Sequence, residues 1–137
     1  MKTHFFRFLL GLCAFSAAAG GAFAQGKPAG TPRLNRFIEL MEAQQPAFGV
    51  FSSIVSTRNG SAMAGSGLDF VIVDLEHSPF DLYRLEGYLL GMVNKAEILK
   101  KGNLQPSVVP IIRVPAAGRE QLQFVIKQVL DLGPMGL

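Results

Sequence analysis

Hydrophobic residues follow two alternating patterns along the chain, one typical of buried strands and one typical of amphipathic helices. Short apolar runs bounded by polar and turn residues predict strands at residues 48–51, 68–73 and 108–114. Apolar residues at helical spacing, together with one segment rich in small residues, predict helices at residues 32–44, 58–66, 80–92 and 118–132. Pro46 ends the first of these helices, and Gly65 or Gly67 closes the second.

The remaining segments complete an alternation of strands and helices. Residues 93–105 are more polar and predict a helix end followed by a surface loop, and residues 135–137 predict the beginning of a fourth strand. Such an order implies parallel strands joined by right-handed crossovers. The pattern therefore predicts an α/β protein with about four strands. Because an apolar strand at the end of a chain would leave an unpaired sheet edge, we expect the sequence to be the first part of a longer fold.

The amino terminus has the pattern of a secretory signal peptide. A short basic start precedes an apolar run at residues 8–19, and Ala22-Phe23-Ala24 supplies the small-residue pattern of a cleavage site. A membrane anchor fits poorly, because this run is shorter than the roughly 20 apolar residues that span a bilayer. We therefore expect residues 1–24 to be removed before Gln25, which leaves no stable membrane anchor.

Cysteine content and charge limit the location and the partners. Cys13 is the only cysteine and would leave with the signal, so the mature chain forms no disulfide, which suits export to a bacterial periplasm. The formal net charge is +3, of which Lys2 and Arg7 contribute two. No basic stripe interleaved with aromatic residues indicates nucleic-acid binding. A length of 137 residues allows one ordinary domain.

Charged side chains come directly after the second and third predicted strands. Asp74, Glu76 and His77 follow the second strand, and Arg113 ends the third. The carboxyl ends of parallel strands are where α/β enzymes hold their chemistry. On a continued strand, Asp74 and Glu76 would point to one side and His77 to the other.

These residue types suggest a chemistry and leave an alternative open. A histidine beside a carboxylate is the arrangement of a general base, and an arginine offers a fixed fork of donors to a carboxylate substrate. A general base at His77 and a carboxylate-binding arginine at Arg113, here called the clamp, at one edge of the sheet would suit proton chemistry on a small oxo-acid. A surface histidine and an ordinary salt bridge would give the same pattern.

Four segments of the chain carry a resemblance to a known family. They are Gly49-Val50-Phe51-Ser52-Ser53, the stretch from Gly67 to Asp81 that contains Asp74-Leu75-Glu76-His77-Ser78-Pro79, Ile111-Ile112-Arg113-Val114-Pro115, and Val129-Leu130-Asp131-Leu132-Gly133. In this order they resemble the HpcH/HpaI aldolase family. The second segment is specific, and the others add weight through their order.

The resemblance implies a (β/α)₈ TIM barrel of which this chain holds only the first half. Its domains would be a signal at residues 1–24, a lead-in and helix at 25–45, and a partial barrel at 46–137. The implied activity is that of a class II aldolase, which cleaves or forms carbon–carbon bonds between a pyruvate-type oxo-acid and an aldehyde. A homo-oligomer is expected for a full-length form.

The resemblance also implies roles for individual residues. His77 matches the catalytic base, Asp74 the carboxylate that orients it, and Arg113 the arginine that binds the oxo-acid and stabilises the enolate. Glu76 is expected to have at most a supporting role. The family uses a divalent metal, magnesium, manganese or cobalt, held by a glutamate and an aspartate on later strands. Those ligands are expected beyond Leu137, so no metal ligand is expected in this chain.

Two departures from the family pattern and two alternatives complete the prediction. The segment 93–105 is longer than the family's usual helix-to-strand link, and Pro134 replaces a small residue in the usual helix-to-strand turn. Three and a half strand–helix units cannot close an eight-stranded barrel, so we expect the chain alone to be inactive. The alternatives are a citrate-lyase-type or malyl-CoA-lyase-type enzyme of the same superfamily, and a non-catalytic exported barrel remnant.

Overall fold

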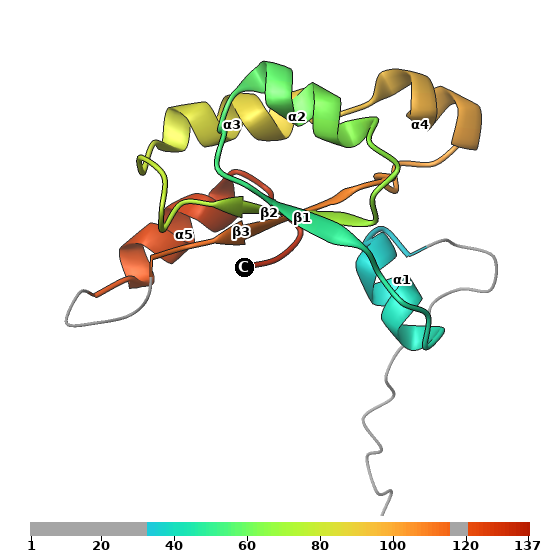
Figure 1. Cartoon of the computed structure of the whole chain (residues 1–137), viewed down its shortest axis with the longest axis horizontal. Coiled ribbons are helices and arrows are strands. Elements are labelled where there is room, and N and C mark those ends of the chain that lie inside the picture. The colour runs from blue at the N-terminus through green and yellow to red at the C-terminus, as the bar shows by residue number, and fades with distance from the viewer. Residues whose placement is uncertain (1–32, 116–120) are drawn as a thin grey trace, which may run out of the picture.

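The computed structural model describes residues 33–115 and 121–137, in which helices pack around a parallel sheet (Figure 1). Among the described residues the sheet has three strands in the order β1-β2-β3, and both pairs are parallel, as the alternation predicts. In chain order the elements are α1 (Arg36–Glu42), β1 (Gly49–Ser52), α2 (Thr57–Ala64), β2 (Phe70–Asp74), α3 (Leu82–Gly91), α4 (Lys95–Lys101), β3 (Val109–Arg113) and α5 (Gln123–Asp131).

One helix was not predicted. The segment at 93–105, expected to be a helix end and a loop, contains the separate helix α4. The Asn94 side chain accepts a hydrogen bond from the Glu97 amide at its start, and Gly102 ends it with a left-handed φ of 68°. No residue of α4 is buried, so the sequence has no apolar stripe that would mark a helix there. Its two caps define it instead.

Several sequence predictions fall outside the described residues. These are the signal peptide with Cys13 and its cleavage site, the lead-in as far as residue 32, and part of the start of the last predicted helix, at 118–120. Among the helices that the structure does describe, none combines the length and the apolar character needed to cross a bilayer.

The core lies between the sheet and the helices that follow its strands. Figure 1 shows α2, α3 and α4 along one side of the sheet. Val71 and Val73 of β2 are fully buried against Leu85 and Tyr88 of α3, and Val129 of α5 joins the same cluster. Because side chains alternate along a strand, the residues between these valines, and Asp74 after them, belong to the opposite face.

Helix α1 lies at the amino-terminal ends of the strands. The Phe37 ring meets the Phe70 ring edge to face with centroids 5.1 Å apart, and Arg36 forms an ion pair with Asp69. The second oxygen of Asp69 accepts a hydrogen bond of 3.0 Å from the Phe48 amide. These contacts fix α1 against the end of the sheet that is opposite to Asp74.

The last described residues run beside β3. The Met135 amide donates to the Pro110 carbonyl, and the Ile112 amide donates to the Gly136 carbonyl, both at 3.0 Å. The Asn35 side chain also donates to the Met135 carbonyl at 2.9 Å. These bonds place residues 135–136 where a fourth strand would begin, although no regular strand forms there.

Candidate active site

The site is built on the carboxyl ends of β2 and β3. The register of the two strands pairs Asp74 with Arg113, so the final residues of both strands lie side by side. One residue further, the Leu75 amide donates to the Arg113 carbonyl at 3.0 Å. Parallel pairing therefore brings together two charged residues that are distant in sequence, as the prediction required.

A tight turn after Asp74 gathers the remaining groups. The Asp74 Oδ1 atom accepts hydrogen bonds from the backbone amides of Glu76, at 3.0 Å, and His77, at 3.2 Å. The Ser78 hydroxyl donates to the Asp74 carbonyl. This side-chain-to-backbone turn is a common use of aspartate at the end of an element. Because the strand stops at Asp74, the alternation of a continued strand does not extend to His77, and its ring lies beside the Asp74 carboxylate.

The imidazole of His77 is held by the carboxylate of Asp74. The Nδ1 atom lies 3.1 Å from Asp74 Oδ2. With Nδ1–H donating to the carboxylate, Nε2 carries the lone pair and is available as a proton acceptor. The His77 side chain is 62% exposed, whereas that of Asp74 is only 8% exposed. The pair thus has a buried orienting group and an accessible base.

Opposing influences act on Asp74. Burial alone would raise the pKa of this carboxyl group. The hydrogen bonds from the His77 and Glu76 amides and from the His77 ring, with the charge of Arg113, outweigh burial and hold the pKa of Asp74 below its ordinary value. Asp74 is therefore a carboxylate at neutral pH, as an orienting partner of the imidazole must be.

Arg113 contacts both carboxylates. Its Nη1 atom lies 3.6 Å from Asp74 Oδ2, and its Nη2 atom forms a close ion pair with Glu76 Oε2. The guanidinium carbon also lies 5.8 Å from the centre of the Phe51 ring. Phe51 belongs to the first segment that resembles the family, but it was not predicted as a site residue. Its place in the register, level with Ile72, puts it on the Asp74 face of the sheet and is the signal that could have found it.

The same three residues form a possible metal-binding group. Asp74, Glu76 and His77 each offer a ligand atom, and these atoms lie within 4.8 Å of one another. Carboxylate oxygens suit hard divalent cations. However, Asp74 is already hydrogen-bonded through both oxygens, and Glu76 is paired with a guanidinium whose positive charge would oppose a cation. As arranged, this group does not fit a resident divalent cation.

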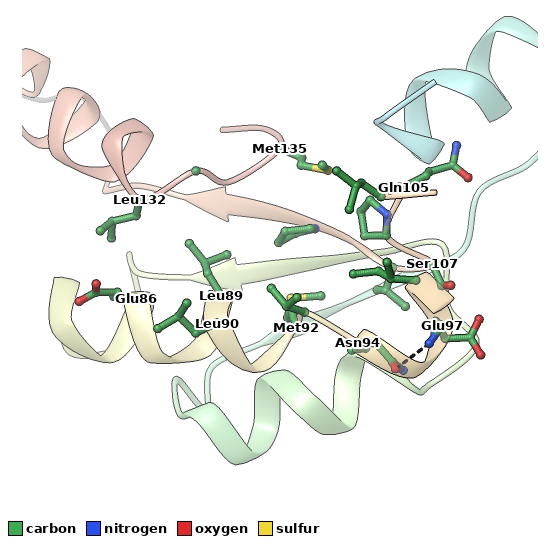
Figure 2. A pocket seen from close by; sticks show the side chains of 18 of the residues that line it. Glu86, Leu89, Leu90, Met92, Asn94, Glu97, Gln105, Ser107, Leu132 and Met135 are labelled. Carbon is green, nitrogen blue, oxygen red and sulfur yellow. Dashed lines mark hydrogen bonds between the residues drawn. The ribbon is translucent and has the colours of Figure 1, made fainter. Parts of the chain in front are cut away.

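A cavity of about 370 Å³ lies away from these residues (Figure 2). It is lined by residues of α3 and α4, of the segment before β3 and of the segment after α5. Leu89, Met92 and Leu132 are among its apolar side chains, and Ser107 among its polar ones. The segment before β3 is at the amino-terminal end of that strand, and Arg113 is at the other end. The cavity and the charged cluster are therefore separate features.

Comparison with known proteins identifies relatives, although no protein-family model matches the chain. The chain is 30% identical over 100 residues to a hydroxypyruvate/pyruvate aldolase from Roseobacter denitrificans, covering 73% of this chain and 33% of that protein. It is 27% identical over 99 residues to a 5-keto-4-deoxy-D-glucarate aldolase from Salmonella newport, covering 72% of this chain and 33% of that protein. The chain therefore spans about a third of the length of these relatives.

A solved structure gives the same answer for the fold. An HpcH/HpaI aldolase/citrate lyase family protein from Burkholderia cenocepacia J2315 superposes with a TM-score of 0.56 and 27% identity. The match covers 73% of this chain and 34% of that one. The parallel sheet with its helices is thus part of a TIM barrel, as the sequence resemblance implied. The chain is a relative of the HpcH/HpaI aldolase family, matching the amino-terminal part of its members.

Proposed function

We propose that this chain carries the acid–base part of an aldolase site that acts on a pyruvate-type oxo-acid. The observation that carries the proposal is the His77–Asp74 pair facing Arg113 across two adjacent strand ends. The relatives from Roseobacter and Salmonella are both named aldolases, which favours this activity over a citrate-lyase-type reaction.

Each residue has a distinct role in the proposed cleavage of a 4-hydroxy-2-oxo acid. His77 Nε2 accepts the proton of the C4 hydroxyl while the bond between C3 and C4 breaks, which releases an aldehyde and leaves the enolate of pyruvate. Asp74 holds the imidazole in the tautomer that can accept this proton. Arg113 binds the carboxylate of the oxo-acid and stabilises the negative charge of the enolate. Return of a proton to C3 yields pyruvate.

Further parts of the proposal concern groups outside the described residues. Resemblance to class II aldolases supports a requirement for magnesium, manganese or cobalt. Because Asp74 and Glu76 are already engaged, we propose that the carboxylates that hold this cation lie elsewhere in a longer protein. We also propose that the protein is exported through residues 1–24 and forms a homo-oligomer.

The test is an assay of pyruvate release from a 4-hydroxy-2-oxo acid with added magnesium or manganese. In a protein that carries this chain within a whole barrel, His77→Ala and Arg113→Ala should each lower the rate at least about 100-fold. Glu86→Gln, a charge removal on the exposed surface of α3, serves as the control and should leave it unchanged. Full activity in either alanine variant would refute the assigned roles.

The 137-residue chain assayed alone should show no turnover, because its strands cannot close a barrel. Turnover that disappears in His77→Ala would contradict this expectation while confirming the role of the histidine. The role of His77 and the inactivity of the chain alone are thus tested by two separate measurements with the same substrate.

A further inference from the structure

We propose that Glu76 is an internal competitor for the substrate. In the ligand-free protein its carboxylate fills the anion-binding fork of Arg113, and the carboxylate of an oxo-acid must displace it to bind. This inference rests on the proposed function, because it takes Arg113 as the group that receives the substrate carboxylate. It assigns Glu76 a role in controlling access to the site.

The contacts of Arg113 show why Glu76 is the competing group. Glu76 Oε2 forms the closest ion pair of the cluster with Arg113 Nη2, whereas Asp74 Oδ2 stays 3.6 Å from Nη1. A carboxylate is also what the oxo-acid would present to the same donors. The Arg113 side chain is 39% exposed, so an anion from solution can reach it.

Asp74, unlike Glu76, cannot move away from Arg113 without breaking the hydrogen bonds of the turn. Both oxygens of Asp74 are held, one by the backbone amides of Glu76 and His77 and the other by the His77 ring. Moving Asp74 would break the turn that positions the base. The Glu76 side chain can leave the guanidinium by rotation, while its backbone amide stays bonded to Asp74. An incoming anion would therefore displace Glu76, rather than Asp74, from Arg113.

The structure also offers a second position for the displaced carboxylate. Glu76 Oε2 lies 3.8 Å from His77 Nδ1, so a small movement carries it from the guanidinium toward the imidazole. Arrival of the oxo-acid would thus bring negative charge closer to the base. Binding and preparation of the base would be linked through one side chain.

The size of the effect follows from the exposure of the pair. Partly exposed ion pairs contribute modestly to stability, so removing the negative charge of Glu76 should tighten anion binding at Arg113 by roughly fivefold. Glu76→Gln removes the charge and preserves the shape of the side chain. Glu86→Gln removes one exposed carboxylate of α3 and matches the change in net charge. Among the described residues, Glu86 forms no ion pair with an arginine, whereas Arg84 of the same helix pairs with Asp81.

The experiment follows the Arg113 side-chain N–H signal by NMR in the 137-residue chain. The signal is assigned with Arg113→Lys, and sodium pyruvate is added at constant ionic strength. We expect half-saturation at roughly fivefold lower pyruvate in Glu76→Gln than in the wild type, and no change in Glu86→Gln. Superimposable backbone amide spectra away from the site verify that each variant is folded.

The possible results separate this inference from the proposed function. Equal or weaker pyruvate binding in Glu76→Gln, with Arg113 still responding, would overturn the competitor role and leave the clamp intact. An Arg113 signal that pyruvate shifts in neither protein would refute binding of the oxo-acid by Arg113 in this chain, and with it the competitor role. The proposed function is decided separately, by the activity of Arg113→Ala in a whole barrel. Only tighter binding confined to Glu76→Gln supports the competitor.

Discussion

Replacing Gly60 with alanine tests how closely α2 and α3 pack above the sheet. A Cβ atom at Gly60 would lie 2.2 Å from the Tyr88 carbonyl oxygen, far inside van der Waals contact. That oxygen belongs to backbone and cannot rotate away, so the two helices must separate. Overpacking of this kind costs about 1–3 kcal/mol. The gain in helix propensity from glycine to alanine offsets about 1 kcal/mol of that cost.

A matched variant separates these two contributions. Gly87→Ala gains the same propensity in α3, but its Cβ would meet only the Thr57 hydroxyl, at 2.8 Å, which a side-chain rotation can relieve. Thermal unfolding followed by circular dichroism should therefore show Gly60→Ala melting below Gly87→Ala. For a domain of this size each 1 kcal/mol corresponds to roughly 4–8 °C. Equal melting temperatures, or a higher one for Gly60→Ala, would refute the close helix contact.

Two further predictions concern buried and charged groups of the same fold. The Tyr88 hydroxyl is buried without a hydrogen-bond partner among the described residues, and burial raises its pKa. Tyr88→Phe should therefore leave the free energy of unfolding unchanged or raise it by up to about 1 kcal/mol, and a clear loss in urea unfolding would contradict this. For Asp69, the hydrogen bond from the Phe48 amide, aided by Arg36, outweighs burial and holds the pKa below 3.8. The ionised Asp69 carboxylate therefore stabilises the folded state fully above the ordinary pKa of 3.8, and this stabilisation is lost as the pH falls through the lowered pKa of the folded state. Asp69→Asn should reduce the urea midpoint more at pH 7 than at pH 2.5, and an equal reduction at both would argue against the linkage.

The sequence predicts the sheet because its strands have a strong and simple signal. Runs of β-branched residues such as Val71-Ile72-Val73 end at charged residues, and the helices between them require parallel strands. The edge that carries Asp74 and Arg113 follows from this order alone. Helix α4 could not be predicted in the same way, because its cap residues rather than an apolar stripe define it.

Details of the site depend on contacts that periodicity does not encode. His77 turns back toward Asp74 only because the aspartate side chain accepts two amides of the following turn. The ion pair between Glu76 and Arg113 depends on the exact register of β2 and β3. Both facts require a position for each backbone atom, whereas the sequence pattern supplies only the order of elements and their ends.

The geometry that brings the acid–base groups together is contained within two adjacent strands, but their environment is not. One local turn orients His77, and one strand pairing delivers Arg113. Yet the two side chains are 62% and 39% exposed, and charges in contact with water interact far more weakly than charges in an enclosed site. An enolate formed beside such an open guanidinium would receive little stabilisation. The proposed reaction therefore requires additional protein over this edge of the sheet, and protection of Arg113 from solvent in a complete protein is the property that should accompany catalysis.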